Sequence, residues 1–597
     1  MPPIPFIGSS YRSRSPAVDG QECINFYLEY YGISGQQVSE YMYGAKQQAK
    51  ATSVLYPTPG LTLFNKGEST PGTVRKVYVS STNRMFAVIG NQLLEYTKLG
   101  KSVSRGALKT NSGYVSIDNC GNGAGRGFGL CIVDGIYGYN YNLTNNTFEQ
   151  ITDPSFPKYP GTVVFMNGFF VINELDSARF WYSQQYDSLD WGDIQVQYLT
   201  EAHIPMQKGP VTLLLEFQSG QPALNDTVIT AGMWTTVTSA SAYFAGIVTS
   251  YDPATGYIVL AVQSYGGESN SNQWSVNFYQ GTTRFYTAEG LPDNIRTITT
   301  IRNDLWIVGE LSVEIWYNPP GYDINNPFIR RTTFMNNGTV AVLSVATGGD
   351  NIFWLGSSAA GFGQIWMSNN YTPVKISTNS IDHMAESLPS VTDATAFTYT
   401  QEGHIFYVLN FTTGNKTFVY DVSTAEWHER ADWDGKKFNR YAPNCHCLFN
   451  DQNLVGDYRN ANIYILDLNN YTDNGKIVRR IRTGPHIHSD RKRIFFKEFE
   501  IDIERGVGLD GVGPAANPQA FLQWSDDGGF TWSNEYWGQF GGRGQYKTRL
   551  HWHRLGYSRD RVFRLTVSDP VKTVLIAARA DIGIEDANAP AMRMQPQ

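Results

Sequence analysis

Charged side chains are scarce in this sequence: Asp, Glu, Lys and Arg make up only 17% of its 597 residues. Ordinary soluble domains contain about 25%. The formal net charge of −7 is mild for a chain of this size, and aromatic residues reach 14%. The composition therefore argues against a strongly basic nucleic-acid-binding protein and against a disordered chain.

Cysteine is also rare, with only five residues, which are Cys23, Cys120, Cys131, Cys445 and Cys447. A small, odd number of cysteines makes no disulfide framework, so we expect a protein that folds in a reducing cytoplasm. The N-terminus, MPPIPFIGSS, has neither the basic nor the apolar region of a signal peptide. No apolar run approaches the ~18 residues of a transmembrane helix, so we expect no membrane segment.

The few charges are distributed unevenly. Between Tyr471 and Ala580 there are 18 Lys and Arg residues against 12 Asp and Glu residues, whereas the whole chain is net negative. Positive side chains gather in the runs VRRIRTG and DRKRIFFKEF. They could line a passage for DNA or face an acidic partner, and solvated strand ends with locally paired charges are an equally good interpretation. The candidate residues are Arg479, Arg480, Arg482, Arg491, Lys492 and Arg493.

What the sequence has in quantity is glycine, with 57 residues, and short aromatic-rich strands. A turn residue, an apolar strand and a second strand rich in Tyr or Trp recur along the chain, as in TTIRNDLWIVGELSVEIWYN from Thr299. From there the repeats are spaced by about 50 residues, which is typical of kelch-like β-propeller blades. In FVYDVSTAEWHER, we expect Trp427 to pack back between blades. The pattern predicts an all-β protein with a propeller of six or seven blades; a tandem array of β-sandwiches is the alternative.

The repeat is interrupted once. The stretch from about Glu201 to Gly281 has its own β pattern, and its removal restores near-even spacing of the blades. It therefore predicts a small β domain inserted in a propeller loop, where insertions are tolerated. After about Thr472 the blade pattern gives way to other strands. The expected domains are an N-terminal segment (1–60), the first part of the propeller (61–200), the inserted domain (201–281), the second part of the propeller (282–472) and a C-terminal β domain with a terminal arm (473–597).

The stretch SDDGGFTWS resembles the Asp box of sialidases, S-x-D-x-G-x-T-W. Asp527 would accept backbone N–H bonds within a turn, Gly529 would permit a positive φ and Trp532 would pack beneath the hairpin. Such a box is structural, and a glycosidase would also need paired carboxylates, or a Tyr nucleophile with an Arg cluster, which nothing local marks. We therefore expect no enzyme, no catalytic residue and no cofactor. The box residues are Ser525, Asp527, Gly529, Thr531 and Trp532.

Three short motifs could supply metal ligands, because residues i and i+2 of a strand share a face. None is accompanied by a partner pair at zinc-site spacing, so buried thiols and surface histidines are the favoured interpretation and we expect no metal. The glycine-rich run GNGAGRGFG, Gly121 to Gly129, lacks the strand and helix of a phosphate-binding loop and reads as a propeller loop. The three motifs are Cys445-His446-Cys447, His486-Ile487-His488 and His551-Trp552-His553.

An ordered set of motifs resembles the tail hub or nozzle proteins of short-tailed bacteriophages, also called packaged-DNA stabilisation proteins. The matching stretches cover most of the chain from Asn25 to Ile582 apart from the inserted domain. They include NFYLE, PTPGL, NGFFVINELDSARFWYSQQYDSLDWGD, TAEGLPDNI, VGELSVEIWYN, KISTNSI, TFVYDVSTAEWHER, SDDGGFTWS and RVFRLTVSDPV.

This resemblance implies a structural protein of the virion tail, made in the host cytoplasm. It implies a ring, typically of six copies, that lies below the portal and its adaptor ring. This ring continues the DNA channel and helps to retain the genome, and the N-terminal segment (1–60) would make ring or adaptor contacts. It also implies tail fibres or tailspikes and a plug or needle protein as partners, with nonspecific passage of double-stranded DNA. The alternative is a glycan-binding or glycan-degrading receptor protein of the tail.

Overall fold

The computed structural model shows a chain built almost entirely of β-strands. It describes residues 1–31, 53–67, 70–121, 128–153, 155–192, 197–200, 208–215, 234–238, 242–252, 255–267, 274–279, 284–288, 290–291, 293–322, 326–358, 361–490, 492–511 and 513–584. The chain forms two compact units. The first comprises Met1–Ile117, Glu289–Asn318 and Ile329–Gln597, and the second comprises Asp118–Ala288 and Pro319–Phe328.

Within the described residues, seven successive antiparallel sheets have the up-and-down connectivity of propeller blades, which confirms the all-β propeller fold. We number these blades 1 to 7 along the chain. Five are in the first unit. Blade 1 has β7 (Val74–Val79), β8 (Met85–Ile89), β9 (Gln92–Tyr96) and β10 (Ser102–Ala107); blade 4 has β25 (Ile295–Ile301), β26 (Asp304–Gly309), β27 (Val313–Tyr317) and β28 (Ile329–Met335); blade 5 has β29 (Gly338–Thr339), β30 (Ala346–Gly348), β31 (Asn351–Ser358), β32 (Gly361–Asn369) and β33 (Thr372–Lys375); blade 6 has β34 (Thr395–Gln401), β35 (His404–Phe411), β36 (Lys416–Asp421) and β37 (Glu426–Glu429); blade 7 has β40 (Pro443–Phe449), β41 (Gln452–Asp457), β42 (Ile463–Asp467) and β6 (Gly60–Leu63).

Blade 7 is completed by a strand from the other end of the sequence. Strand β6 pairs with β42 in antiparallel register, Leu61 opposite Leu466. Gly60 lies so close to the backbone carbonyl oxygens of Asn470 and Thr472 that a Cβ atom would sit 2.3 and 2.5 Å from them. Only glycine therefore fits at the start of this strand. Two short strands, β43 (Thr472–Asp473) and β44 (Lys476–Ile477), extend the same sheet.

The second unit holds the other two blades and the inserted sheet. Blade 2 has β11 (Ser116–Asn119), β12 (Leu130–Val133), β13 (Gly138–Tyr141) and β14 (Phe148–Gln150), and blade 3 has β15 (Pro160–Met166), β16 (Phe169–Glu174), β17 (Arg179–Tyr182) and β24 (Phe285–Thr287). Strands β17 and β24 are neighbours in blade 3, with Phe180 opposite Tyr286, although about a hundred residues separate them. The inserted domain therefore enters between the third and fourth strands of this blade.

The inserted domain is a six-stranded antiparallel sheet in the order β18-β23-β20-β21-β22-β19. It has a separate apolar core, which includes Phe244, Ile258 and Trp274. This confirms the inserted small β domain expected from the interrupted repeat. Its strands are β18 (Gln197–Thr200), β19 (Gly209–Leu214), β20 (Trp234–Thr238), β21 (Ala242–Asp252), β22 (Tyr257–Gly267) and β23 (Trp274–Tyr279).

The tight hairpins of the blades explain why the repeat is visible in the sequence. Several pairs of turn residues adopt the left-handed region, for example Asn167 and Gly168 (φ 49° and 98°) and Arg302 and Asn303 (φ 49° and 64°). Two consecutive positive φ values define the two-residue turns that match the twist of antiparallel strands. Between blades, Trp427 is 2% exposed and packs in one cluster with Phe353 of blade 5 and Tyr407 of blade 6, as expected.

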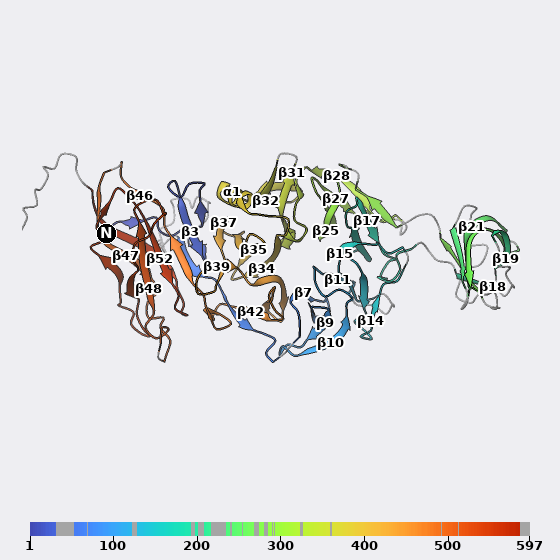
Figure 1. Cartoon of the computed structure of the whole chain (residues 1–597), viewed down its shortest axis with the longest axis horizontal. Helices are drawn as coiled ribbons and strands as arrows, with labels where there is room; N and C mark the ends of the chain where they lie inside the picture. Colours follow the sequence, from blue (N-terminus) through green and yellow to red (C-terminus); the bar gives the residue numbers. More distant parts are fainter. Residues whose placement is uncertain are drawn as a thin grey trace, which may run out of the picture. The chain divides into compact units, whose positions relative to one another are not determined.

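The C-terminal region is a β-sandwich that includes the N-terminal strands. One layer has the order β4-β5-β53-β47-β50, and the other continues from blade 6 as β37-β3-β45-β52-β48-β49. In Figure 1 the blue strand β3 lies between β37 and β52, and its direct neighbour on the β52 side is β45. The strands are β1 (Pro3–Ile4), β2 (Tyr11–Arg12), β3 (Gly20–Ile24), β4 (Phe26–Tyr30), β5 (Ser53–Pro57), β45 (Arg480–Thr483), β46 (Ile487–His488), β47 (Ile494–Ile503), β48 (Gln519–Ser525), β49 (Tyr536–Gln539), β50 (Leu550–His553), β51 (Tyr557–Ser558), β52 (Asp560–Val567) and β53 (Leu575–Ile584).

The N-terminal segment was expected to be distinct from the C-terminal β domain, but its strands are part of the sandwich. Its aromatic and apolar residues enter the sandwich core, in which Phe6, Phe26 and Leu55 contact strands β47, β52 and β53. Strand pairing over more than 400 residues leaves no local signal in a sequence. The residue limits of the expected domains stay predictions.

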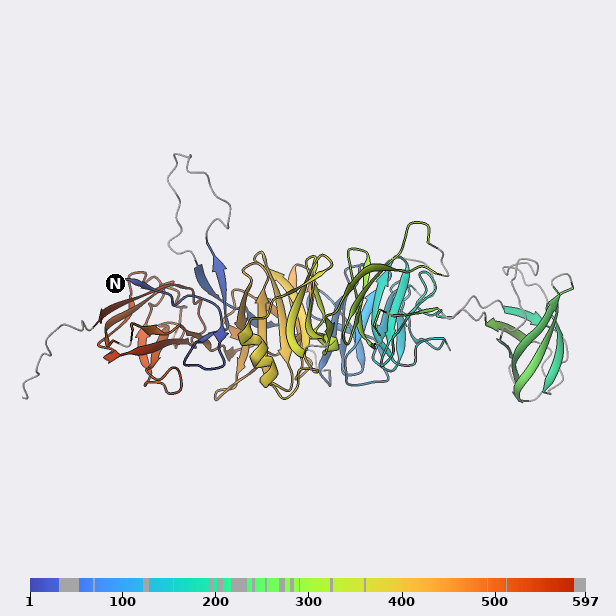
Figure 2. The ribbon, with the colours of Figure 1, turned by 90° about the horizontal axis from the view of Figure 1, so that it is seen from above.

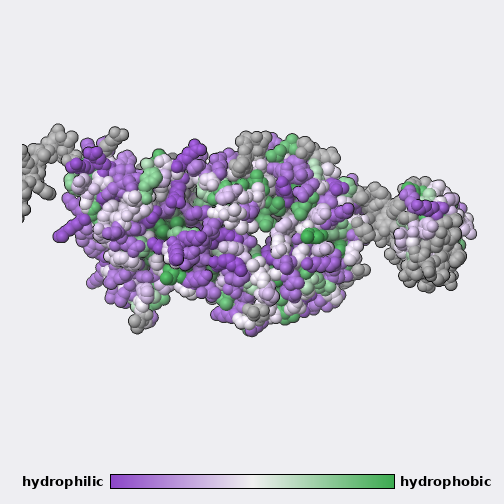
Figure 3. Space-filling view, viewed as in Figure 1, coloured by the Kyte–Doolittle hydropathy of each residue, from purple (hydrophilic) through white to green (hydrophobic). Residues whose placement is uncertain are grey.

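Helix is almost absent from the described residues. The α-helix α1 (Asn379–Ser387) follows blade 5 and begins at Thr378, whose side chain accepts a hydrogen bond from the Ile381 backbone. Figure 2 shows it as the yellow coil lying across the strands of the same colour. On the face of the C-terminal region in Figure 3, polar residues predominate and apolar residues form small separate patches.

Candidate functional site

The six basic residues expected to face DNA or a partner have three different environments. Arg480 and Arg482 are buried with no exposed surface, and Arg479 is partly buried. Lys492 and Arg493 are exposed, and Arg491 lies outside the described residues. Burial excludes Arg480 and Arg482 from any surface that the chain presents, which corrects the expectation for these two.

Arg482 holds the N-terminal segment against the sandwich. Its guanidinium donates hydrogen bonds to the backbone carbonyl oxygens of Phe6 (2.6 Å), Ser9 (2.8 Å) and Glu22 (3.3 Å) and to Gln21 Oε1 (2.6 Å). Burial lowers the pKa of Arg482 to about 10, so the side chain remains charged at neutral pH. A buried arginine with five donors can thus bind several carbonyl and amide oxygens of the N-terminal segment at once.

Arg480 lies beside the carboxyl group of Asp473, and both are buried. It donates to the backbone oxygens of Tyr471 (3.3 Å) and Val478 (3.5 Å). Burial lowers the pKa of Arg480 to about 10. Burial and the neighbouring Asp432 raise the pKa of Asp473 to about 7, although Arg480 acts in the opposite direction.

This raised pKa gives a testable pH dependence. A carboxyl group whose pKa is higher in the folded state stabilises the fold below its unfolded pKa of about 3.9, and this contribution is lost as the pH rises through about 7. We expect Asp473→Asn, which mimics the neutral form, to unfold at a higher temperature than the parent chain, by a smaller margin at pH 5 than at pH 8.5. Calorimetry at the two pH values measures the difference; an equal difference at both would contradict the assignment.

Arg479 and Arg493 contact aromatic faces. The guanidinium carbon of Arg479 lies 4.5 Å from the ring centre of Trp433, and burial lowers the pKa of this arginine. The guanidinium carbon of Arg493 lies 5.3 Å from the ring centre of Tyr557. Cation–π contacts of this kind position a charge without neutralising it. Lys492 and Arg493 are therefore the described members of the set that remain available to a polyanion or an acidic surface.

The Asp-box motif forms a closed polar turn at the end of β48. Asp527 accepts hydrogen bonds from the side chains of Ser525 (2.6 Å) and Thr531 (2.6 Å) and from the backbone N–H groups of Phe530 (3.0 Å) and Thr531 (2.9 Å). Gly529 has φ +96°. These bonds, first the one from Ser525, hold the pKa of Asp527 well below its usual range. The carboxylate is thus fully occupied in closing the turn.

Two arginines of β52 fix this turn to the sandwich. Arg561, 2% exposed, forms a two-bond ion pair with Asp526 (2.6 and 2.7 Å), and its guanidinium carbon lies 4.6 Å from the ring centre of Phe496. The guanidinium carbon of Arg564 lies 3.6 Å from the ring centre of Trp532. Trp532 therefore packs on Arg564. No local pattern predicts the contacts of this turn with Arg561 and Arg564.

Arg564 also connects the turn to the N-terminal segment. Its Nη2 donates to Glu22 Oε2 at 2.6 Å. Burial would raise the pKa of Glu22, but Arg564 and Arg12 together keep it lowered. Arg564 of β52 thus connects the Asp-box turn, through Trp532, to strand β3, through Glu22.

We expect Asp527→Ala to open this turn without unfolding the sandwich. The alanine variant leaves the N–H groups of Phe530 and Thr531 without their acceptor, so cleavage within residues 525–533 becomes on the order of tenfold faster in limited proteolysis. Glu535→Ala, at an exposed position nearby, is the matched control and should be cleaved like the parent. Equal cleavage of all three chains would show that the carboxylate does not hold the turn.

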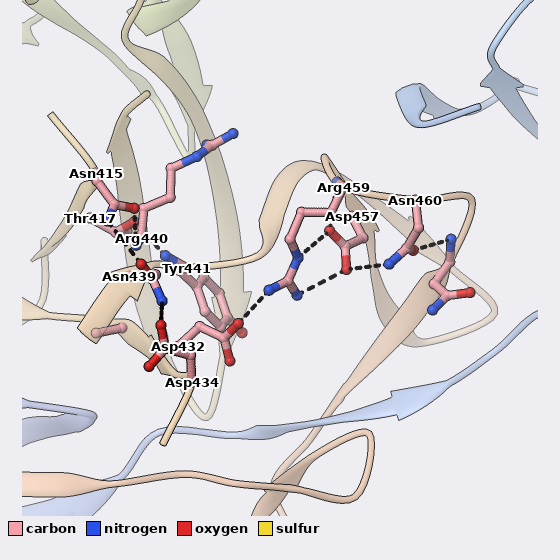
Figure 4. Close-up of polar contacts among 12 residues, drawn as sticks. Asn415, Thr417, Asp432, Asp434, Asn439, Arg440, Tyr441, Asp457, Arg459 and Asn460 are labelled. Atoms are coloured by element: carbon pink, nitrogen blue, oxygen red, sulfur yellow. Dashed lines mark hydrogen bonds and ion pairs between the residues drawn. The ribbon is translucent and has the colours of Figure 1, made fainter. Parts of the chain in front are cut away.

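A second polar network lies where blade 6 passes into blade 7 (Figure 4). Arg459 bonds to both carboxylate oxygens of Asp457 (3.1 Å each) and also pairs with Asp432. Asp457 has no exposed surface, and Asn460 donates to it at 3.2 Å. These ions and amides are each satisfied within the chain, so the network fixes the short hairpin of β38 (Ala431–Trp433) and β39 (Phe438–Arg440) against blade 7.

Two of the three metal-ligand motifs are used for packing and hydrogen bonding. Cys445 and Cys447 are buried in the apolar cluster of blades 1 and 7. His446, on the other face of β40, bonds to Asn453 (2.9 Å), and burial lowers its pKa to about 4. His486 bonds through one ring nitrogen to Asp560 (2.8 Å) and through the other to the Pro16 carbonyl oxygen (2.9 Å). The third motif, His551-Trp552-His553, has a different environment, because Glu498 lies beside its two histidines.

Two further features are the glycine-rich run and a cleft beside α1. Residues 122–127 of the glycine-rich run lie outside the described residues. A cleft of about 340 Å³ lies between strand β2 and α1. Its Asp382 is engaged by Ser377 and Lys375, each at 2.5 Å. Among the described residues, no helix has the length and apolar character needed to cross a membrane.

The blades, the inserted sheet and the sandwich that shares its layers with the N-terminus define a structural β-propeller protein. Residues 235–471 match the family model described as bacteriophage P22 Gp10, beta-propeller, and residues 479–583 match the one described as bacteriophage P22 Gp10, beta-sandwich. The two matches adjoin and together cover more than half of the chain. The chain belongs to the P22 Gp10 family, and it is thus a structural protein of a phage tail with its place in the virion.

Comparison with curated proteins finds no match. Among solved structures, a crystal structure of the computationally designed Ika8 protein is similar at 9% identity, with a TM-score of 0.31, and the match covers 67% of this chain and 98% of that one. The family membership therefore rests on the two family models. A family of structural tail proteins argues against an enzyme.

Proposed function

We propose that this chain is the nozzle subunit of a short phage tail. Six copies form a ring below the portal and the adaptor ring, continue the DNA channel and help to retain the packaged genome. The ring also carries the tail fibres or tailspikes and the plug or needle. The observation that supports this proposal best is the ordered pair of family matches, propeller followed by sandwich, over residues 235–583.

The structure of the C-terminal region suits a load-bearing subunit. Strand β3 pairs with β37 of blade 6 on one side and with β45 of the sandwich on the other, at Ile24 opposite Glu429 and Ile481. The propeller and the sandwich are thus joined by continuous backbone hydrogen bonding, in addition to the linker after blade 7. A subunit that transmits the force of packaged DNA benefits from such a junction.

The charge distribution fits a channel wall along which DNA slides. The chain is net negative, at −7, and two of its six candidate basic residues are buried inside it. Tight DNA binding requires many exposed Lys and Arg contacts to phosphates, and each contact would oppose ejection. We therefore expect weak, salt-sensitive contact with DNA at most.

The proposal is tested by assembly with the adaptor ring. The purified chain is mixed with the adaptor and portal of the same virion and imaged by electron microscopy, with native mass spectrometry to count subunits. We expect a six-fold ring bound to the adaptor. A chain that remains monomeric in the presence of the adaptor would contradict the proposal.

The inserted sheet could give the tail a second function, the binding of host-surface glycans. It has its own core and presents the exposed side chains of Tyr243, Tyr257 and Tyr265. Because β18 pairs with β23, a deletion that removes the whole inserted sheet spans residues 197–279. Rings that assemble normally but no longer adsorb to host cells would support this function, and unchanged adsorption would exclude it.

A further inference from the structure

One histidine motif gains a third ligating residue from the fold. His551 and His553 lie two residues apart on β50, so their side chains share a face of the strand. The neighbouring strand β47 places Glu498 directly opposite His553 and Glu500 opposite His551. Glu498 is more than 50 residues away from both histidines in the sequence, so the sequence pattern contains only the pair of histidines.

The three side chains bring their donor atoms together. One ligand atom from each of Glu498, His551 and His553 lies within 4.8 Å of the other two. Nδ1 of His553 is 3.9 Å from Glu498 Oε2, and the two imidazole rings are 4.7 Å apart. These are the only three such residues that the described part of the chain gathers in this way.

An unsatisfied polar atom supports a ligand at this place. Nδ1 of His551 is buried and has no hydrogen-bond partner among the described residues. A buried ring nitrogen without a partner costs free energy, and a coordinated cation would remove this cost. His553, with its side chain 57% exposed, leaves the site open to solvent on one side.

The neighbouring charges leave Glu498 free to act as a ligand. Arg549, the residue immediately before β50, is bound mainly to Glu500, through Nε (2.9 Å) and Nη2 (2.7 Å). Its contact with Glu498 Oε1 is longer, at 3.5 Å. On the other side of β47, Asp581 of β53 is opposite Glu498 and adds a negative charge. A cation at the cluster would thus meet a carboxylate that is not fully neutralised by an arginine.

We propose that Glu498, His551 and His553 bind one divalent transition-metal ion of the zinc class. Two imidazole nitrogens and one carboxylate oxygen are a ligand set that Zn²⁺ accepts, whereas Mg²⁺ and Ca²⁺ prefer oxygen ligands throughout. Three protein ligands leave a fourth position for water. Because β50 is the edge strand of its sheet, the ion would hold this edge to β47.

Metal binding by the full-length chain tests the site directly. The chain is treated with chelator, dialysed against micromolar ZnCl₂ and analysed for bound zinc by mass spectrometry, and Co²⁺ is used as a spectroscopic probe of coordination geometry. We expect one zinc ion per chain, with visible absorption bands of four-coordinate Co²⁺. His553→Ala and Glu498→Gln, both at partly exposed positions, should each weaken zinc binding by at least about tenfold.

The matched control is His488→Ala, because His488 is an exposed histidine on another strand. It should keep the bound ion, and zinc should raise its unfolding temperature as it does for the parent chain but not for the two ligand variants. The proposal is overturned if the parent binds no zinc, if the ligand variants bind as much as the parent, or if the control loses the ion as well.

Discussion

Replacing Arg482 by alanine is expected to destabilise the sandwich by about 3–5 kcal/mol, because buried carbonyl groups lose their donors and the side chain leaves a void. The backbone oxygens of Phe6, Ser9 and Glu22 would each lose the hydrogen bond that Arg482 donates. The N-terminal strands should then detach before the blades unfold. Calorimetry should show a separate transition at lower temperature, and proteolysis should remove the residues before β4 first.

Two further variants make this expectation specific. Arg482→Lys keeps the charge but reaches fewer carbonyl groups, so it should recover only part of the lost stability. Arg493→Ala removes an exposed arginine of the same predicted set and should change the unfolding free energy by less than about 0.5 kcal/mol. If Arg482→Ala were as stable as Arg493→Ala, the N-terminal segment would not depend on the buried guanidinium.

The second large effect is expected at Trp427, which packs blade 6 onto blade 5. Trp427→Ala removes a side chain that is 2% exposed and donates through its indole nitrogen to the Ile376 carbonyl oxygen at 2.9 Å. Truncation of a buried tryptophan costs about 3–5 kcal/mol through lost burial and the remaining cavity. We expect a lower unfolding temperature for the propeller and fewer assembled rings under electron microscopy.

The matched control for this variant is Trp537→Ala, since Trp537 is 57% exposed. It should cost less than about 1 kcal/mol, most of it from the contact with Phe521, whose ring centre is 4.9 Å away. Trp427→Phe should fall between the two because it fills most of the space but lacks the indole donor. Equal stability of the two alanine variants would mean that Trp427 does not join the blades.

The sequence predicted the features that depend on residues close together along the chain, such as the hairpin turns and the Asp box. Hairpin turns favour asparagine, aspartate or glycine at positions of positive φ, so residues such as Asn167 and Asn303 mark the blades directly. The Asp box is a set of hydrogen bonds within seven residues, and its pattern gave the roles of Asp527 and Gly529. The inserted domain was visible because it interrupts a regular spacing.

What the sequence could not predict depends on distant partners. Arg480 and Arg482 belong to a run that resembles a basic surface, and only the three-dimensional fold shows that carbonyl groups from residues 6–22 and 471–478 enclose them. Glu498 joins the histidine pair only through the register of β47 and β50. Strand β6 and the N-terminal strands likewise carry no local sign of their partners.

The pairing of the first strands with the last has a consequence for the order of events during synthesis. Leu61 cannot form its native strand pair until Leu466 has been synthesised, and Ile4 cannot form its pair until Ala578 has been synthesised. At roughly 5–20 residues per second, the roughly 400 residues between Leu61 and Leu466 take on the order of 20–80 seconds to translate, and the longer span from Ile4 to Ala578 takes on the order of 30–115 seconds. During that interval the apolar strands at the start of the chain cannot be buried against their native partners, so the nascent chain can aggregate. A chaperone that binds these strands would prevent this until translation is nearly complete.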